Sequence, residues 1–477
     1  MENNKSLWPK KYNRPILLLS FLTMAVSFIS FGEMSVSLWF LVFHFLTIVL
    51  FLYCLKSFYE KSKTYSTNKF EKKLFTIGLL IRTASILFFY LLFYVLTNTE
   101  FDIAAQDAVW YHDTGIKIAK QLSEFRFNRD DLGSSIDFDD LGYNLFLGGV
   151  YFIFGPIVII ARIIQAIFGS FSAVLIYRIG KSLYNENVGR MASVLFLFFP
   201  LFIYFNVLHL KETLMLFLTL LSLGSIINFQ TKKNKVKHIA VFFLTILLTF
   251  SFRAVLSYTL LATFFLTLLI TNKFKLYHKL SIGLFSLVFL VLFGWQIGLL
   301  DEFSGKFIKY INKNSESSLM DNSAERMVNS GQTFAKFASG PVILVQSVSF
   351  PYPSMVKTNL GDYGQADQWY HISSLFLWAF LSYWAILGIY DSARMNWREN
   401  FPLLCFTVLF SLILVITLYI TSVRFNILKM APMLIFVAVG LNNNSLRRQK
   451  YWSFYMVWMC VVIMVWNYAK IAGRGLI

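Results

Sequence analysis

Charge is scarce in this sequence of 477 residues. Asp, Glu, Lys and Arg together make up 14% of the chain, against roughly a quarter of an average soluble protein. Hydrophobic residues make up 57%, and they include 52 Phe, 24 Tyr and 11 Trp, which is more aromatic surface than one globular core can hide. The composition therefore excludes a soluble enzyme.

Cysteine is rarer still. Cys54, Cys405 and Cys460 are the whole set, and each lies inside an apolar block without the spacing of a metal-ligand motif. This pattern excludes a disulfide framework and a zinc site. We expect no tightly bound metal and no other cofactor.

The positive charge of the chain is not placed as in a nucleic-acid-binding protein. The formal net charge is +18, but the Lys and Arg residues lie in short loops between apolar blocks. In a membrane protein such residues report orientation, because they are retained on the cytoplasmic side. We expect a membrane around the protein and no nucleic acid as a partner.

Apolar blocks recur at lengths of about 16 to 24 residues, enough for a helix to cross a hydrocarbon layer of roughly 30 Å. They predict an all-α polytopic membrane protein with a bundle of about 13 transmembrane helices. The predicted spans are 15–32, 36–56, 74–97, 157–180, 190–208, 212–229, 238–253, 255–271, 279–300, 369–390, 401–420, 425–441 and 451–468. The first block is interpreted as a retained helix, because no convincing small-residue cleavage site follows it.

The loop charges orient these spans. Residues 56–73 carry six Lys against two Glu, and threading the chain with this loop inside also places the Lys-rich segment 230–238 inside. The segment 98–140, with ten Asp or Glu against four Lys or Arg, then faces outward. Whether the stretch 141–154 crosses the membrane decides the orientation of every later span. Its fourteen residues are too few to cross comfortably, so we expect a helix lying on the outer surface.

Five segments follow from this threading. Residues 1–97 form the N-terminal transmembrane helices, and 98–156 form a first outer loop with interfacial helices. Residues 157–300 form the central transmembrane bundle, 301–368 a large outer loop and 369–477 the C-terminal transmembrane helices. Loops of such length are usually functional, so we expect the chemistry on the outer face.

Within the first outer loop, the segment 103–122 has helical spacing, with an apolar side formed by Ala104, Ala108, Tyr111, Ile118 and Leu122. This predicts an amphipathic helix on the membrane surface, with Asp107 and Tyr111 on neighbouring turns. A carboxylate in such apolar surroundings is partly desolvated, which raises its basicity and suits it to act as a general base. The other interpretation is that Asp107 is one of ten acidic groups in a solvated loop.

The run from Asp107 to His112 (DAVWYH), followed by 115–119 (GIKIA), resembles the first-loop signature of the polyprenyl-phosphate-sugar-dependent glycosyltransferases of the GT-C class. That class includes the dolichyl-phosphate-mannose protein mannosyltransferases and the aminoarabinose transferases of lipid A. The similarity continues at 142–144 (GYN), 154–155 (FG), 161–165 (ARIIQ), 177–184 (YRIGKSLY), 199–200 (FP), 209–214 (HLKETL) and 424–432 (RFNILKMAP). The order of these motifs and their shared outer placement carry the resemblance, and it implies a GT-C-like bundle.

The chain departs from the family's pattern in two respects. Two predicted spans precede the signature loop, where many relatives have one, and the sequence shows no large C-terminal outer domain. The acceptor-recognising part of the pattern is therefore missing or replaced by 301–368. The resemblance does not carry over the identity of the sugar or of the acceptor.

The resemblance implies transfer of a sugar from a polyprenyl phosphate carrier to a hydroxyl of a lipid, polysaccharide or protein acceptor. It implies a bacterial cytoplasmic membrane with the active site facing outward. Asp107 occupies the position of the base, and Glu212 is a second carboxylate at the outer end of another predicted span. Tyr111 and His112 are expected to contact the substrate.

Four cations are candidates for the leaving phosphate. Arg162, Lys211, Arg253 and Arg424 each lie at the predicted outer end of a span, and such a ring suits an anionic headgroup whose tail remains in the lipid. Taken singly, each is also interpretable as a side chain that anchors a helix at the interface. Lys211 and the adjacent Glu212 are equally interpretable as a structural ion pair.

The acidic run 137–140 (DFDD) resembles the metal motif of nucleotide-sugar transferases. That motif belongs to soluble or cytoplasm-facing domains, whereas this segment is predicted to face outward. A loosely held divalent ion is the most that the run suggests.

Two other function classes compete with a GT-C enzyme. A polysaccharide polymerase or O-antigen ligase concentrates its catalytic Arg and His in the large late loop, but 301–368 holds only Arg326 and no His. A flippase or transporter of lipid-linked sugars carries charges near the bilayer centre, whereas most charges here lie at predicted span ends. The sequence also lacks an internal repeat and a matched pair of broken helices of the kind that transporters use.

Overall fold

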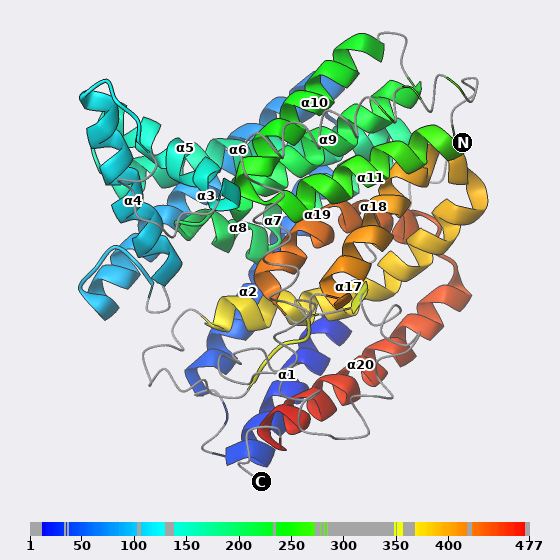
Figure 1. Ribbon diagram of the computed structural model, residues 1–477. Helices are drawn as coiled ribbons and strands as arrows, with labels where there is room; N and C mark the ends of the chain where they lie inside the picture. The colour runs from blue at the N-terminus through cyan, green and yellow to red at the C-terminus, as the bar shows by residue number, and fades with distance from the viewer. Residues whose placement is uncertain are drawn as a thin grey trace.

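The computed structural model describes residues 12–32, 35, 38–102, 106–128, 138–231, 235–271, 277, 281, 284, 348–349, 351–355, 368–416 and 422–472. Within them the chain forms fifteen helices and no β-strand (Figure 1). In chain order the helices are α1 (Asn13–Phe31), α2 (Leu38–Ser62), α3 (Thr67–Thr97), α4 (Gln106–Ser123), α5 (Phe138–Phe154), α6 (Val158–Leu183), α7 (Glu186–Phe198), α8 (Pro200–Val207), α9 (Glu212–Thr231), α10 (Lys235–Phe252), α11 (Ala254–Thr271), α17 (Gln368–Met395), α18 (Trp397–Ile416), α19 (Val423–Asn442) and α20 (Leu446–Ala472). Most of the predicted span 279–300 and most of the predicted loop 301–368 lie outside the described residues.

Eleven of these helices are long and apolar enough to cross a membrane. They are α1, α2, α3, α6, α9, α10, α11, α17, α18, α19 and α20. Large apolar side chains such as Leu50, Leu91 and Trp458 are exposed on them, as expected where the surrounding solvent is lipid. The protein is therefore an all-α polytopic membrane protein, as its composition predicted.

The predicted span 190–208 is not one straight helix. α7 and α8 together meet the criteria for a span, but they are bent by 49° relative to each other. Pro200 begins α8 and has no backbone N–H, and the preceding Phe199 is extended, with φ −66° and ψ 120°. The prediction of an unbroken helix is corrected to a helix kinked at this proline.

Two shorter helices, α4 and α5, lie side by side at one end of the bundle (Figure 1). The buried side of α4 consists of Ala108, Tyr111, Thr114, Gly115, Ile118 and Gln121. It includes three residues of the predicted apolar side, Leu122 is half-buried, and Ala104 lies outside the described residues. A Cβ on Gly148 of α5 would lie 2.3 Å from Cγ2 of Ile118, so the missing side chain lets the two helices approach closely. α5 has 17 residues and is not among the candidate spans, in agreement with the surface helix predicted over 141–154.

α19 runs through the interior of the bundle. Every residue from Asn426 to Leu441 on this helix is buried. α19 packs against α17 so closely that a Cβ on Gly440 would lie 2.2 Å from the carbonyl oxygen of Trp384. This packing gives a rigid base to the first turn of α19, which carries Arg424.

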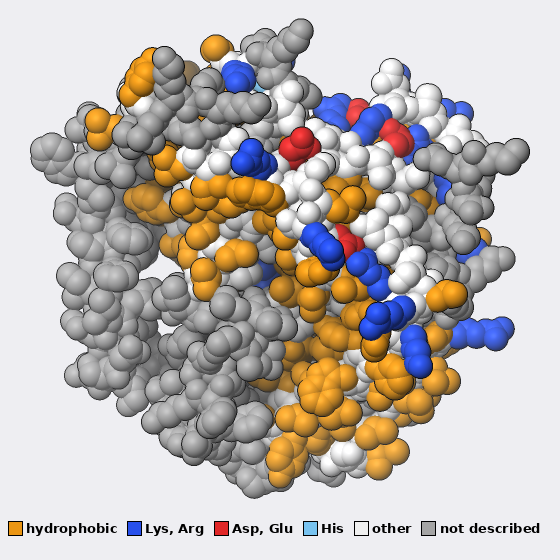
Figure 2. All heavy atoms as spheres, turned by 90° about the vertical axis from the view of Figure 1, so that its right-hand side faces the viewer, with side chains coloured by type: hydrophobic (Ala, Val, Ile, Leu, Met, Phe, Trp, Pro, Cys, Tyr) orange, Lys and Arg blue, Asp and Glu red, His pale blue; other side chains and the backbone are white. Residues whose placement is uncertain are grey.

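The two ends of the bundle differ in charge. On α6, Arg162 and Lys181 are nineteen residues apart, about 28 Å along a helix, so they mark opposite ends. We call the end at Arg162 the α4–α5 end and the other the basic end. Exposed or half-buried cations at the basic end include Lys63, Lys69, Lys72, Lys73, Arg178, Lys235, Lys237, Arg394, Arg398, Arg447 and Lys450. Figure 2 looks onto the basic end, where Lys and Arg side chains are spread over the surface with a few Asp and Glu among them.

Candidate functional site

An arginine at the start of α19 joins two carboxylates from distant parts of the chain. Arg424 donates from Nη1 to Oδ2 of Asp107 and from Nε to Oε1 of Glu212. Asp107 lies in the first turn of α4 and Glu212 in the first turn of α9, where the helix dipole favours a negative charge. The Asp107 side chain is 58% exposed and the Glu212 side chain 2%. One guanidinium therefore holds a solvent-accessible carboxylate and a buried one together.

A second ion pair lies next to Glu212 in the chain. Lys211 pairs with Asp140 of α5 and donates to the carbonyl oxygen of Phe252 at 2.8 Å. Tyr111 donates to the same Oδ1 of Asp140 at 3.3 Å. Burial by itself would raise the pKa of Asp140, but the Lys211 ammonium holds this pKa below its usual range. Burial lowers the pKa of Lys211, whereas the Asp140 carboxylate raises it and so helps to keep the Lys211 ammonium charged.

Arg253 connects α10 and α11 beside this pair. Its guanidinium carbon lies 4.3 Å from the centre of the Phe425 ring, in a cation–π contact. Its charge also lowers the pKa of Asp140 and of Lys211, which requires it to be close to both. Because Phe425 follows Arg424 in the chain, three of the four predicted phosphate ligands lie in one neighbourhood.

The fourth cation, Arg162, is fully buried in the first turns of α6. It donates from Nη2 to the carbonyl oxygen of Glu100 at 2.9 Å. Its Nε and Nη1 have no hydrogen-bond partner among the residues that the structure describes. A buried guanidinium with unused donors costs free energy.

Two histidines lie on either side of Tyr151 of α5. The Tyr151 hydroxyl is 2.8 Å from Nδ1 of His112 and 3.0 Å from Nε2 of His209. Burial lowers the pKa of His112, and it lowers the pKa of the fully buried His209 still more strongly. Both rings are therefore neutral at pH 7. Nδ1 of His209 is another buried atom for which the described residues provide no hydrogen-bond partner.

Tyr143 joins the histidine side of the cluster to the carboxylate side. Its ring centre lies 4.8 Å from that of Tyr111 and 6.1 Å from that of His209. Gln165 of α6 donates to the Tyr143 hydroxyl. The polar groups at the α4–α5 end thus form one continuous cluster built from α4, α5, α6, the α8–α9 and α10–α11 connections, and α19.

All eight residues predicted for the site lie in this cluster. Asp107, Glu212 and Arg424 are in direct contact; Lys211 and Tyr111 meet at Asp140. Arg253 is close to Lys211 and Asp140, while His112 and Arg162 lie on the Tyr151 side. The packing of the helices thus brings all eight residues to the α4–α5 end.

Two expectations about the carboxylates differ from the structure. Asp107 was expected to be partly desolvated, but its side chain is 58% exposed, because it lies in the first turn of α4, at the very start of the helix. Lys211 and Glu212 were alternatively interpreted as a pair with each other. Each instead has an oppositely charged partner from a distant helix, Asp140 and Arg424 respectively.

The sequence analysis did not assign a role to Asp140, Tyr143, Tyr151 or His209. A signal existed for three of them, because Asp140 lies in the acidic run 137–140 and Tyr143 and His209 lie in motifs that carried the resemblance. Tyr151 has no such signal. It belongs to the cluster only because α5 packs between α4 and the α8–α9 connection.

No group of three or more His, Cys, Asp or Glu side chains is arranged to hold a metal ion in the part of the chain that the structure describes. Of the acidic run considered for a divalent ion, Asp137 lies outside the described residues. Asp140 is paired with Lys211, and an ammonium competes with a metal for the same oxygen. The described geometry therefore adds nothing to the suggestion of a divalent ion.

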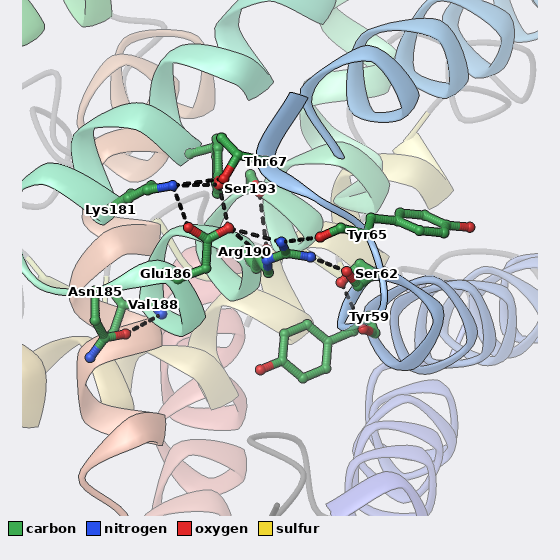
Figure 3. Close-up of polar contacts among 11 residues, drawn as sticks. Tyr59, Ser62, Tyr65, Thr67, Lys181, Asn185, Glu186, Val188, Arg190 and Ser193 are labelled. Atoms are coloured by element: carbon green, nitrogen blue, oxygen red, sulfur yellow. Dashed lines mark hydrogen bonds and ion pairs between the residues drawn. The ribbon is translucent and has the colours of Figure 1, made fainter. Parts of the chain in front are cut away.

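A different charged cluster lies at the basic end (Figure 3). Arg190 of α7 donates to the carbonyl oxygens of Ser62 and Tyr65, the latter at 2.6 Å, and to Oε1 of Glu186 at 2.9 Å. Lys181 completes the cluster by pairing with Oε2 of Glu186 at 2.5 Å. These contacts clamp the α2–α3 turn onto the α6–α7 turn, which is a structural role.

Comparison of the chain with protein-family models gives no match, and no curated protein matches its sequence. The resemblance to the GT-C class therefore remains a resemblance between motifs. The function has to be argued from the residues of the α4–α5 end.

Proposed function

We propose that the protein is a membrane glycosyltransferase that moves a sugar from a polyprenyl phosphate carrier to a hydroxyl of an acceptor. The observation that carries the proposal is the contact of Asp107 and Glu212 with Arg424 at one end of a transmembrane bundle. Three residues that lie on three helices, far apart in the chain, meet where a lipid-anchored substrate and a water-borne acceptor can both arrive.

In this reaction the acceptor oxygen attacks the anomeric carbon of the sugar, and the bond from that carbon to the phosphate oxygen breaks. The acceptor proton passes to a carboxylate, and polyprenyl phosphate leaves. Asp107 is the better base because its side chain is accessible, whereas Glu212 is buried and holds Arg424. Movement of Arg424 from Asp107 to the departing phosphate would free the base as it neutralises the leaving group.

The remaining cations suit the carrier phosphate. Lys211 and Arg253 lie beside Arg424, and Arg162 has two buried donors without a partner. A phosphate accepts several charge-assisted hydrogen bonds at once, so it would satisfy donors that the protein leaves unused. We propose that the sugar is contacted by Tyr111, on the carboxylate side of the cluster, and by His112, on its histidine side.

We further propose a bacterial cytoplasmic membrane with this site facing outward. The support is the charge difference between the two ends, because cations are retained on the cytoplasmic side. Outside the cell no nucleotide sugar is available, which favours a lipid-linked donor. The acceptor is a glycolipid, a polysaccharide or a protein of the cell envelope.

One observation favours a second candidate, a flippase or transporter of lipid-linked sugars. Arg82 lies midway along α3 and is fully buried, and within the described ranges its Nε and Nη2 have no hydrogen-bond partner. Lys429 is likewise fully buried within α19. Such intramembrane cations mark transport pathways as well as active sites, so the position of charges at span ends does not by itself exclude transport.

Incubation of the purified protein with a panel of polyprenyl-phosphate sugars and candidate acceptors tests the proposal. We expect one donor to release free polyprenyl phosphate, detected by mass, and Glu212→Gln to abolish that release. A protein that consumes no donor but moves a fluorescent lipid-linked sugar across a vesicle bilayer would be a transporter. In that case the glycosyltransferase proposal fails.

A further inference from the structure

The start of α3 carries a basic hollow at the basic end of the molecule. Its described lining is Asn68, Lys69, Lys72, Lys73 and Thr76, and its volume is about 370 Å³. All five side chains are exposed. Three ammonium groups within two turns of one helix repel one another unless an anion lies between them.

No carboxylate of the described residues pairs with these three lysines. Glu71 is the one acidic residue in this stretch of α3, and it is engaged elsewhere: Arg178 donates to its two oxygens at 3.0 and 2.6 Å. Glu60, in the preceding helix, pairs with Lys63. No described carboxylate therefore neutralises the positive charge of the hollow, which attracts an anion.

The same face of α3 is apolar further along the helix. A stripe of exposed residues continues at three- and four-residue steps from Lys69 through Lys73, Thr76, Leu80, Ala84 and Leu87 to Leu91. α3 has 31 residues, so it is about 46 Å long and exceeds the hydrocarbon thickness of roughly 30 Å. Its first turns thus reach headgroup level, and the apolar stripe runs below them into the lipid.

We propose that this face of α3 binds an anionic phospholipid, with its phosphate in the lysine-lined hollow and an acyl chain along the stripe from Leu80 to Leu91. A free phosphate would satisfy the lysines but would leave the stripe unused. A zwitterionic lipid brings its own cation next to the lysines, which weakens its attraction to them. The site lies at the end opposite the candidate functional site, so it does not depend on the proposed function.

Photolabelling of the purified full-length protein tests this proposal. The probe is phosphatidylglycerol with a photoactivatable group on an acyl chain, and the labelled peptides are mapped by mass spectrometry. We expect the label on residues 77–92 of α3. Unlabelled phosphatidylglycerol should compete for it, whereas phosphatidylcholine and millimolar inorganic phosphate should not.

A charge-matched pair of variants sharpens the test. Lys69→Gln/Lys72→Gln/Lys73→Gln should raise the lipid concentration for half-maximal labelling roughly tenfold or more. The control Lys235→Gln/Lys237→Gln/Lys450→Gln removes three cations from the same end, away from the hollow, and should label as the wild type does. An equal loss of labelling in both variants would show that general surface charge causes the effect, and it would contradict a specific lipid site at the hollow.

The wild type alone can also overturn the proposal. Label spread evenly over the lipid-facing helices would leave no specific site, and equal competition by phosphatidylcholine would leave no preference for an anion. Displacement of the label by inorganic phosphate would assign the hollow to phosphate rather than to lipid. These outcomes do not require any variant to fold.

Discussion

The charged clusters at the two ends of the bundle are built differently. At the basic end, each side-chain nitrogen of Arg190 donates to an acceptor, either a backbone carbonyl oxygen or Glu186. At the α4–α5 end, Arg162 and His209 have buried nitrogen atoms, and Glu212 a buried oxygen, that find no partner in the described part of the chain. Unpaired buried groups reduce stability. The two clusters therefore differ in how far the buried hydrogen-bonding groups of their charged residues are satisfied.

The largest expected effect is in cysteine labelling that reports the orientation in the membrane, because a position is either labelled or not. In a background without the three native cysteines, a membrane-impermeant thiol reagent added to intact cells should label Ser123→Cys on α4 but not Ser66→Cys before α3. Both positions are exposed, so access to the reagent depends only on the side of the membrane. The reverse pattern would put the α4–α5 end in the cytoplasm and remove the case for a lipid-linked donor.

Asp107→Asn should lower turnover by about 10²–10⁴, because the amide keeps the shape but cannot accept a proton. Binding of the donor should be largely retained. Asp113→Asn is the matched control, since Asp113 is also exposed on α4 and has no role in the proposed reaction. Small and equal effects of the two changes on the rate would return Asp107 to the status of a solvated surface residue.

Arg162→Gln should weaken binding of polyprenyl phosphate by about 1.5–3 kcal/mol, roughly tenfold to a hundredfold. The reason is that the unused donors of Arg162 are then no longer available to the phosphate. Titration with a fluorescent polyprenyl phosphate measures the dissociation constant. Unchanged affinity would show that the unpartnered atoms of Arg162 serve something other than the carrier.

Arg190→Met should reduce stability without changing affinity for the carrier, in contrast to the loss of affinity expected for Arg162→Gln. It removes the hydrogen bonds of a charged group to two backbone carbonyls and to Glu186, which should cost about 2–3 kcal/mol of the free energy of unfolding. Unfolding in detergent measures the loss, and affinity for polyprenyl phosphate should not change. A folded variant with lost affinity would contradict the division between a structural end and a ligand-binding end.

The smallest expected effect is the contribution of His209 to the pH dependence of the free energy of unfolding. Burial depresses the pKa of His209 in the folded protein, whereas the unfolded chain has an ordinary histidine pKa of about 6.5. His209 therefore favours folding above this value, and that contribution is lost as the pH falls below it. Between pH 7.5 and 5.5 the loss should be about 1.4 kcal/mol. His209→Gln should remove this share of the pH dependence of unfolding, and an unchanged dependence would contradict the burial of a neutral ring.

Much of the fold was predictable because the free energy of placing a segment in lipid depends on its own residues and not on distant parts of the chain. Apolar length located the spans, and the spacing around Tyr111 located α4. The kink at Pro200 was missed because the surrounding residues are uniformly apolar, although the proline itself was a sufficient warning. The exposure of Asp107 was missed because apolar neighbours in sequence do not surround a side chain at the start of a helix.

The sequence alone established a membrane bundle, its spans and the positions of charge at helix ends, since each of these depends on a few neighbouring residues. Which charges meet depends on how helices pack. Arg424 contacts Asp107 and Glu212, which are 317 and 212 residues away in the chain. Lys211 forms its ion pair with Asp140 of α5 and not with the adjacent Glu212. Such partners arise from the packing of α4, α5, α9 and α19 at one end of the bundle, and no local pattern specifies that packing.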